Sequence, residues 1–182
     1  MERCSDLSSY GPQVVNEFIS LGWTPVNDET RRDTLSVLAD GLVIATGTYR
    51  QPNNWPQQIA DAKKLTDLVE VPRPDRYTVF SGAENGAAAA LIVLQLEASQ
   101  VRCNYSGPTD SEMTSLIDIL IEMDLGIGVS PADPAFEMGT ITQAFGDTSV
   151  SIQVARYTAI PVELGRAPLA EIGFSIIVTP GS

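Results

Sequence analysis

The sequence predicts a mainly β fold with helices, a β-sandwich of about eight strands and three helices. Several segments alternate apolar and polar residues with a period of two, which is typical of half-buried strands. Turn dipeptides such as Asp40-Gly41 and Gly146-Asp147 separate some of these segments. Three further segments have helical spacing of their apolar residues. The alternative is a two-layer α+β sandwich, which applies if residues 83–98 are a helix.

The composition is that of a globular protein. Of 182 residues, 43% are hydrophobic and 19% are charged, which is ordinary for a folded chain. This length can bury a sizeable core without disulfides. We expect a single domain, residues 1–182, with an N-terminal helical segment (1–33) and a β-rich core (34–180).

The three expected helices each have a start or stop signal. The first covers residues 12–21 and ends at Gly22. The second runs from about Trp55 to residue 69. The third begins with the capping box Thr109 and Glu112.

Two segments in the first half predict strands. "SVLADGLVIATGTYR" (36–50) has Asp40-Gly41 between two apolar runs, which favours a hairpin because Asp-Gly suits a type I′ turn. "RYTVF" (76–80) predicts a short strand.

Residues 87–105 decide the fold class. Apolar and polar residues alternate in both halves of this segment, with a parity slip at Ser99-Gln100 of the kind that a β-bulge or sharp bend produces. A helix would place Gln95, Ser99 and Arg102 on one face, but the segment ends in β-forming residues. We expect one long bent strand, which counts as two in the total of eight.

The C-terminal part predicts a hairpin and a final strand. "GTITQAF" (139–145) and "TSVSIQVARYTAI" (148–160) flank Gly146-Asp147. The last strand is "IGFSIIVTP" (172–180), whose apolar residues alternate with small or polar ones over most of its length.

The chain is acidic, with a net charge of −12. Residues 106–182 carry ten Asp and Glu against Arg156 and Arg166. Because phosphates are repelled by such a surface, tight binding of nucleic acid through this half is not expected.

The sequence contains no histidine, which removes the most common general base and metal ligand. A Ser-Lys site would need Lys63 or Lys64, which we expect on the polar side of the second helix. The glycine-rich "SGAENGA" (81–87) lacks a phosphate-loop lysine and is interpreted as a turn. We therefore expect no catalytic residue, no cofactor and no enzymatic activity.

Four carboxylates were weighed as metal ligands and none is expected to bind a metal: Asp110, Glu112, Asp133 and Glu137. The first two lie at an expected helix start, where the dipole already favours acids. Five arginines in the first half are interpreted as scattered surface residues rather than one binding face: Arg31, Arg32, Arg50, Arg73 and Arg76. Four aromatic residues are candidate interface anchors, although Trp55 is interpreted as core: Tyr10, Trp23, Tyr49 and Trp55.

Cys4 and Cys103 are the only cysteines. With no apolar signal segment near the N-terminus, we expect reduced thiols rather than a disulfide framework. The longest apolar run has eight residues (87–94), too few to span a membrane. We expect no secretion through a signal peptide, no membrane contact, and a location in a virion or the host cytoplasm.

The order of elements resembles the single jelly-roll shell domain of icosahedral viral coat proteins, over residues 34–180. The ending "APLAEIGFSIIVTPGS" (167–182) looks like the terminal strand of such coats. The resemblance implies a jelly-roll-like sandwich and a non-enzymatic subunit of a viral or phage particle (coat, decoration or tail). It also implies self-association into a symmetric homo-oligomer, with other particle proteins as further partners. Coats that package single-stranded RNA usually have a basic arm, which "MERCSDLSSYGPQ" (1–13) is not, and the net charge of −12 also differs from theirs.

The alternative function is an acidic inhibitor that blocks a basic, nucleic-acid-binding site on a protein partner. The acidic helix 110–124 would be its contact, with Asp118, Glu122 and Asp124 as the central charges. A self-assembling subunit should form large species, whereas an inhibitor should be a monomer or small dimer.

Overall fold

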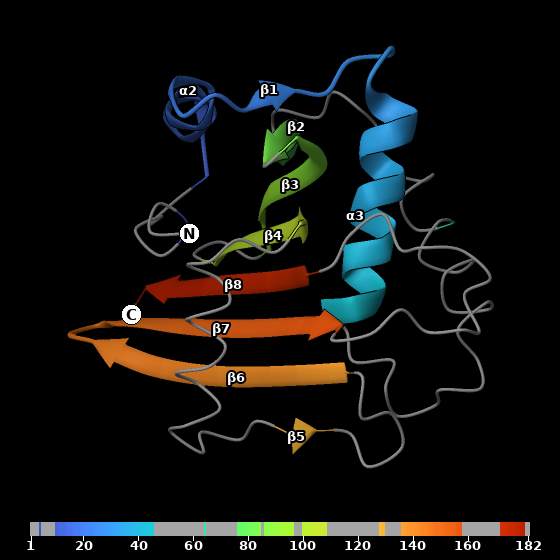
Figure 1. The fold of residues 1–182 in the computed structure, drawn as a ribbon. Coiled ribbons are helices and arrows are strands. Elements are labelled where there is room, and N and C mark those ends of the chain that lie inside the picture. The colour runs from blue at the N-terminus through green and yellow to red at the C-terminus, as the bar shows by residue number, and fades with distance from the viewer. Residues whose placement is uncertain are drawn as a thin grey trace.

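The centre of the fold is one antiparallel sheet, seen in a computed structural model (Figure 1). The structure describes Cys4, residues 10–45, Lys64, and residues 76–84, 86–96, 100–108, 128–129, 136–157 and 172–180. Its described strands are β1 (Thr24–Pro25), β2 (Tyr77–Glu84), β3 (Ala87–Gln95), β4 (Val101–Gly107), β5 (Gly128–Val129), β6 (Phe136–Phe145), β7 (Thr148–Tyr157) and β8 (Ile172–Pro180). They lie in the order β1-β2-β3-β4-β8-β7-β6-β5. The predicted mainly β fold with helices is confirmed.

Two described helices cover opposite faces of this sheet. Helix α2 (Pro12–Ser20) packs its buried residues Val14 and Phe18 on one face. Helix α3 (Arg31–Ala45) crosses the other face, over β3, β4, β8 and β7 (Figure 1). Among the described residues, the layers are therefore helix, sheet and helix.

The core on the α2 side is built from apolar rows that cross three neighbouring strands. Because opposite residues of paired strands point to the same face, the register of β4, β8 and β7 aligns three such rows. The rows are Val101–Val178–Val150, Cys103–Ile176–Ile152 and Tyr105–Phe174–Val154. All of these side chains are buried except Ile152, which is half-buried. Burial of this kind contributes about 1.5–3 kcal/mol for each large apolar side chain.

On the α3 side, small residues allow the helix to approach the sheet closely. Ala90, Ser106 and Gly173 are aligned across β3, β4 and β8. A Cβ atom built on Gly41 of α3 would overlap the Ser106 side chain and come within 2.9 Å of its Cα. The hydroxyl of Ser106 also donates a hydrogen bond to the Leu38 carbonyl of α3 (3.4 Å). Gly41 is thus required by the contact between helix and sheet.

The hairpin predicted at Asp40-Gly41 is therefore wrong, because residues 36–45 belong to α3. The helix begins after a turn in which the Asn27 Oδ1 atom accepts hydrogen bonds from the backbone N–H groups of Glu29 and Thr30 (both 3.0 Å). The Asp-Gly pair does not form a turn here. Gly41 lies within the helix, where its missing side chain leaves room for Ser106. The β-rich core predicted from residue 34 accordingly begins with a helix.

Residues 87–95 and 101–105 lie in strands, as predicted, but these are two strands that pair with each other and not one bent strand. Strand β3 pairs antiparallel with β4, with Leu91 opposite Tyr105 and Val93 opposite Cys103. The Leu96 amide donates a hydrogen bond to the Gln100 carbonyl (2.9 Å). The parity slip at Ser99-Gln100 therefore marks a chain reversal between two strands.

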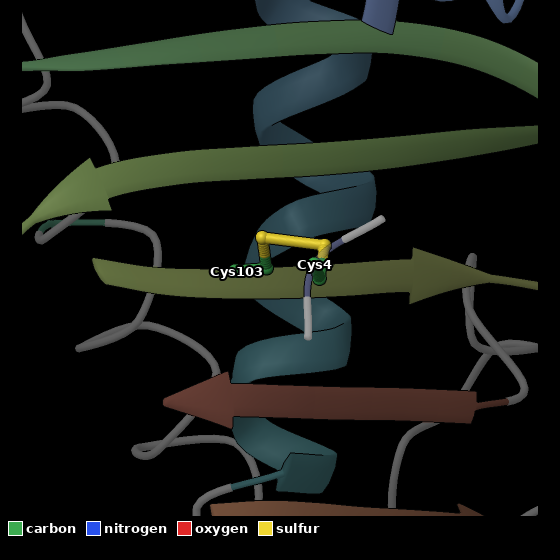
Figure 2. The surroundings of a disulfide bond; sticks show 2 residues. All are labelled: Cys4 and Cys103. Atoms are coloured by element: carbon green, nitrogen blue, oxygen red, sulfur yellow. A yellow bond between two sulfur atoms is a disulfide. The ribbon is translucent and has the colours of Figure 1, made fainter. Parts of the chain in front are cut away.

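Cys4 and Cys103 form a disulfide, so the prediction of reduced thiols is wrong (Figure 2). Their Cα atoms are 5.9 Å apart, a normal separation for this bond. Both side chains are buried in the core that contains Val14 and Phe18. The disulfide lies on the face of β4 opposite to α3, as Figure 2 shows.

The other predicted elements that the structure describes are confirmed. Helix α2 ends two residues before Gly22. The predicted strand 76–80 lies in β2, apart from Arg76, and the final strand is β8 with the predicted bounds. Strands β6 and β7 form the hairpin at Gly146-Asp147, where Gly146 has a φ of 60° that suits glycine in such a turn. The second and third predicted helices lie outside the described residues, except for Lys64, which is helical. The single domain stays a prediction.

Removing the disulfide should destabilise the protein. The bond joins residues 99 positions apart, and a closed loop of this size contributes about 4.7 kcal/mol in the chain-entropy model. We expect the double variant Cys4→Ala/Cys103→Ala to lose about 3–5 kcal/mol of unfolding free energy in urea denaturation. Dithiothreitol should cause a similar loss in the parent protein and none in the double variant. An unchanged midpoint of the parent protein under reduction would contradict the bond.

Adding one methyl group at Gly41 should also destabilise the protein. Overpacking against Ser106 costs about 1–3 kcal/mol, whereas the gain in helix propensity offsets about 1 kcal/mol. We expect Gly41→Ala to lose a net amount of up to about 2 kcal/mol of unfolding free energy in urea denaturation. Gly11→Ala is the matched control, since a Cβ atom at Gly11 has no neighbour within 4 Å. Equal stability of the two variants would refute the close contact.

Candidate assembly surface

Strand β6 forms most of one edge of the sheet. Its inner side pairs with β7 over ten consecutive residue pairs, from Phe136–Tyr157 to Phe145–Thr148, without a bulge. On its outer side, β5 pairs only with Glu137 and Met138. No described strand pairs with the outer side of β6 from Gly139 to Phe145, and we call this stretch the open edge.

The end of the open edge is exposed on both faces of the sheet. Thr142, Gln143 and Ala144 are all exposed, and consecutive strand residues point to opposite faces. The Thr142 hydroxyl donates to the Ser151 hydroxyl of β7 (3.1 Å). Both faces of the sheet are therefore exposed at Thr142, Gln143 and Ala144.

The open edge is also free of charge, in contrast to the acidic chain around it. Between Met138 and Ala155, Asp147 is the only charged residue. The open edge contains no proline, lysine or bulge, the usual features that prevent an edge strand from pairing with another chain. Its backbone N–H and C=O groups therefore form a template for a further strand.

The opposite edge of the sheet is protected. Strand β1 has two residues, one of which is Pro25, and short strands and prolines both limit edge pairing. It covers β2 at Phe80 and Ser81, and the Val26 amide continues the contact by donating to the Val79 carbonyl (2.9 Å). Among the described strands, only residues 77–78 and 82–84 of β2 therefore have no partner on this edge, whereas the open edge is one continuous stretch from Gly139 to Phe145.

The residues weighed as metal ligands are not brought together in the part of the chain that the structure describes. Glu137 lies on β6, opposite Arg156 of β7 in the register. Asp110, Glu112 and Asp133 lie outside the described residues, as does the acidic helix 110–124 with its three central carboxylates. Among the described residues, no group of three or more Cys, Asp or Glu could hold a metal ion.

Most of the glycine-rich segment 81–87, interpreted as a turn, lies in strands: its residues up to Glu84 belong to β2, Gly86 is in a turn and β3 begins at Ala87. Of the two lysines, Lys64 is exposed, and Lys63 lies outside the described residues. Arg31 and Arg32 lie in the first turn of α3, whereas Arg76 directly precedes β2.

Arg102 on β4 is a basic residue that the sequence did not single out as a site. It is half-buried, and its Nε atom is buried without a hydrogen-bond partner. In the register, Arg102 lies between Leu94 and Ile177. The sequence pattern does not reveal this environment. Arg102 occupies an ordinary polar position in the alternation of β4, and its apolar neighbours are known only from the pairing with β3 and β8.

Two of the aromatic anchor candidates belong to the core of the α2 face. Trp23 packs edge-on against Tyr105, with ring centroids 6.2 Å apart. The Tyr10 hydroxyl is hydrogen-bonded to the Thr78 hydroxyl (2.6 Å). Both are partly buried, so they are not free to anchor a partner. Tyr49 and Trp55 lie outside the described residues.

Comparisons of the chain with protein-family models, with curated proteins and with solved structures found no match. Neither helix in the described part of the chain has the length and apolar character needed to cross a membrane.

Replacing Arg102 by an apolar residue of similar length should not weaken the fold. A buried donor without a partner costs about 1–3 kcal/mol, and the methionine side chain preserves much of the packing of the arginine stem. We expect Arg102→Met to be about 1 kcal/mol more stable than the parent in urea denaturation. The exposed Arg76 provides the control variant Arg76→Met, which should change stability by less than about 0.5 kcal/mol. A marked loss for Arg102→Met alone would show that the guanidinium is paired.

Proposed function

We propose that this protein is a non-enzymatic structural subunit that self-associates to build a viral or phage particle. The observation that carries the proposal is the open edge of β6. No described strand pairs with its outer side, it is uncharged and regular, and Thr142, Gln143 and Ala144 are exposed. Added strands bind to such edges through main-chain hydrogen bonds.

The distribution of charge supports association of identical chains. A net charge of −12 keeps separate subunits soluble but opposes their close approach. Along the open edge itself two copies can meet without a charged residue between them, because Glu137 and Asp147 lie beyond its two ends.

The disulfide between Cys4 and Cys103 is also in keeping with a particle subunit. Disulfides persist in oxidising surroundings, which include the surfaces of virions, and are rare in the reducing cytosol. The assignment to a particle, as opposed to another kind of assembly, rests on the resemblance of the final strand, β8, to the terminal strand of viral coat proteins, since the first hairpin of that resemblance is helix α3.

The test is the mass of the purified protein in solution, measured by light scattering over a range of salt concentrations. We expect species much larger than the 19.5 kDa chain, growing as salt screens the acidic surface, since the Debye length falls from about 10 Å at 0.1 M to about 3 Å at 1 M. Electron micrographs of the large species should show closed particles, tubes or rings. A monomer at every salt concentration would contradict the proposal.

The variant Thr142→Lys should reduce the protein to monomers under conditions in which the parent assembles. A lysine at the exposed edge opposes pairing, although it lowers the net negative charge and so weakens the general repulsion between copies. The control is Asn16→Lys, which makes the same change of charge at an exposed position of α2. Equal assembly of both variants would exclude the open edge as the contact.

A further inference from the structure

The two edges of the sheet differ so strongly that they restrict how a second copy can bind. In head-to-tail association, the open edge would have to pair with the β1 edge of the next copy. That edge has only Thr24 and Pro25 in its outermost strand, and the stretches of β2 on either side of the contact with β1 (77–78 and 82–84) are too short to match the open edge. It is followed closely by the acidic pair Asp28 and Glu29, both exposed. The β1 edge is therefore too short, and has too few backbone N–H donors, to pair with the whole open edge.

The open edge is, by contrast, complementary to itself. We propose that β6 of one copy pairs antiparallel with β6 of a second copy around a two-fold axis at Thr142. This inference rests on the proposed self-association and names its contact. The two sheets then continue as one sheet across the dimer.

The position of the axis follows from the geometry of paired strands. Residues that lie opposite each other in a sheet must have their side chains on the same face, and strand side chains alternate between faces. An antiparallel pair around a two-fold axis normal to the sheet therefore places one residue opposite its own copy. Thr142 is the centre of the open edge, so an axis there pairs Gly139 with the partner's Phe145 and uses the full length.

The chemistry of the paired residues is compatible with this arrangement. Thr140 lies opposite the partner's Ala144, Ile141 opposite Gln143, and Thr142 opposite Thr142. None of these positions carries a charge, and a regular pairing of this length forms about six to eight backbone hydrogen bonds. The first charged residues beyond the pairing are Glu137, where β5 occupies the outer side of β6, and the partner's Asp147, so like charges flank the pairing at both ends. Their repulsion should make the dimer stronger in salt.

A single introduced cysteine tests the register. The chain has two cysteines, and both are held in the Cys4–Cys103 disulfide, so Thr142→Cys supplies the reactive thiol. Opposite residues have Cβ atoms about 4.5–5.5 Å apart, within reach of a short bis-maleimide. Ala144→Cys is the matched control on the same strand and face. Its two copies would be separated by four residue steps, about 14 Å along the strand.

We expect Thr142→Cys to give at least about tenfold more covalent dimer than Ala144→Cys. A protein that assembles by light scattering but gives equal crosslinking at both positions would overturn the proposed axis while leaving self-association intact. Efficient crosslinking between a Thr142→Cys copy and a Thr24→Cys copy would overturn it in favour of head-to-tail association. A parent protein that stays monomeric would contradict both the proposed self-association and the proposed two-fold axis.

Discussion

Strand β8 is hydrogen-bonded to β4 on one side and to β7 on the other, and it joins two groups of strands that are otherwise paired with their neighbours in sequence. Strands β1 to β4 form one group and β5 to β7 the other. The rows of apolar side chains across β4, β8 and β7 stabilise this junction, and α3 crosses the same strands on the opposite face. The fold therefore depends on contacts that are far apart in sequence.

The insertion of β8 also determines which strand lies at the edge. Because β8 occupies the place beside β7, the β6–β7 hairpin is displaced outward, and β6 has only the two residues of β5 beyond it. The uncharged composition of β6 favours pairing with another chain only because β6 lies near the edge of the sheet. In the middle of a sheet the same residues would be an ordinary strand, whereas at an edge they leave backbone groups available to another chain.

Local signals in the sequence predicted the elements, and non-local contacts account for what was missed. The β6–β7 hairpin and β8 follow from alternation and from Gly146, which are properties of adjacent residues. Asp40-Gly41 was misread because Gly41 is needed for contact with Ser106, which lies 65 positions later in the chain. The disulfide joins residues that are 99 positions apart, and no spacing rule connects them. The open edge could not be predicted, since it depends on strand order and not on the pattern of β6 itself.

The attachment of Cys4 to β4 has a mechanical consequence. The disulfide connects the N-terminal segment to a strand in the interior of the sheet, so tension applied at the N-terminus is transmitted to β4 without passing through α2, α3 or the strands β1 to β3. The C-terminal strand β8 is the direct neighbour of β4. A force that pulls the two ends of the chain apart would therefore be carried by the β4–β8 ladder, and about half of the chain would remain unloaded behind the crosslink.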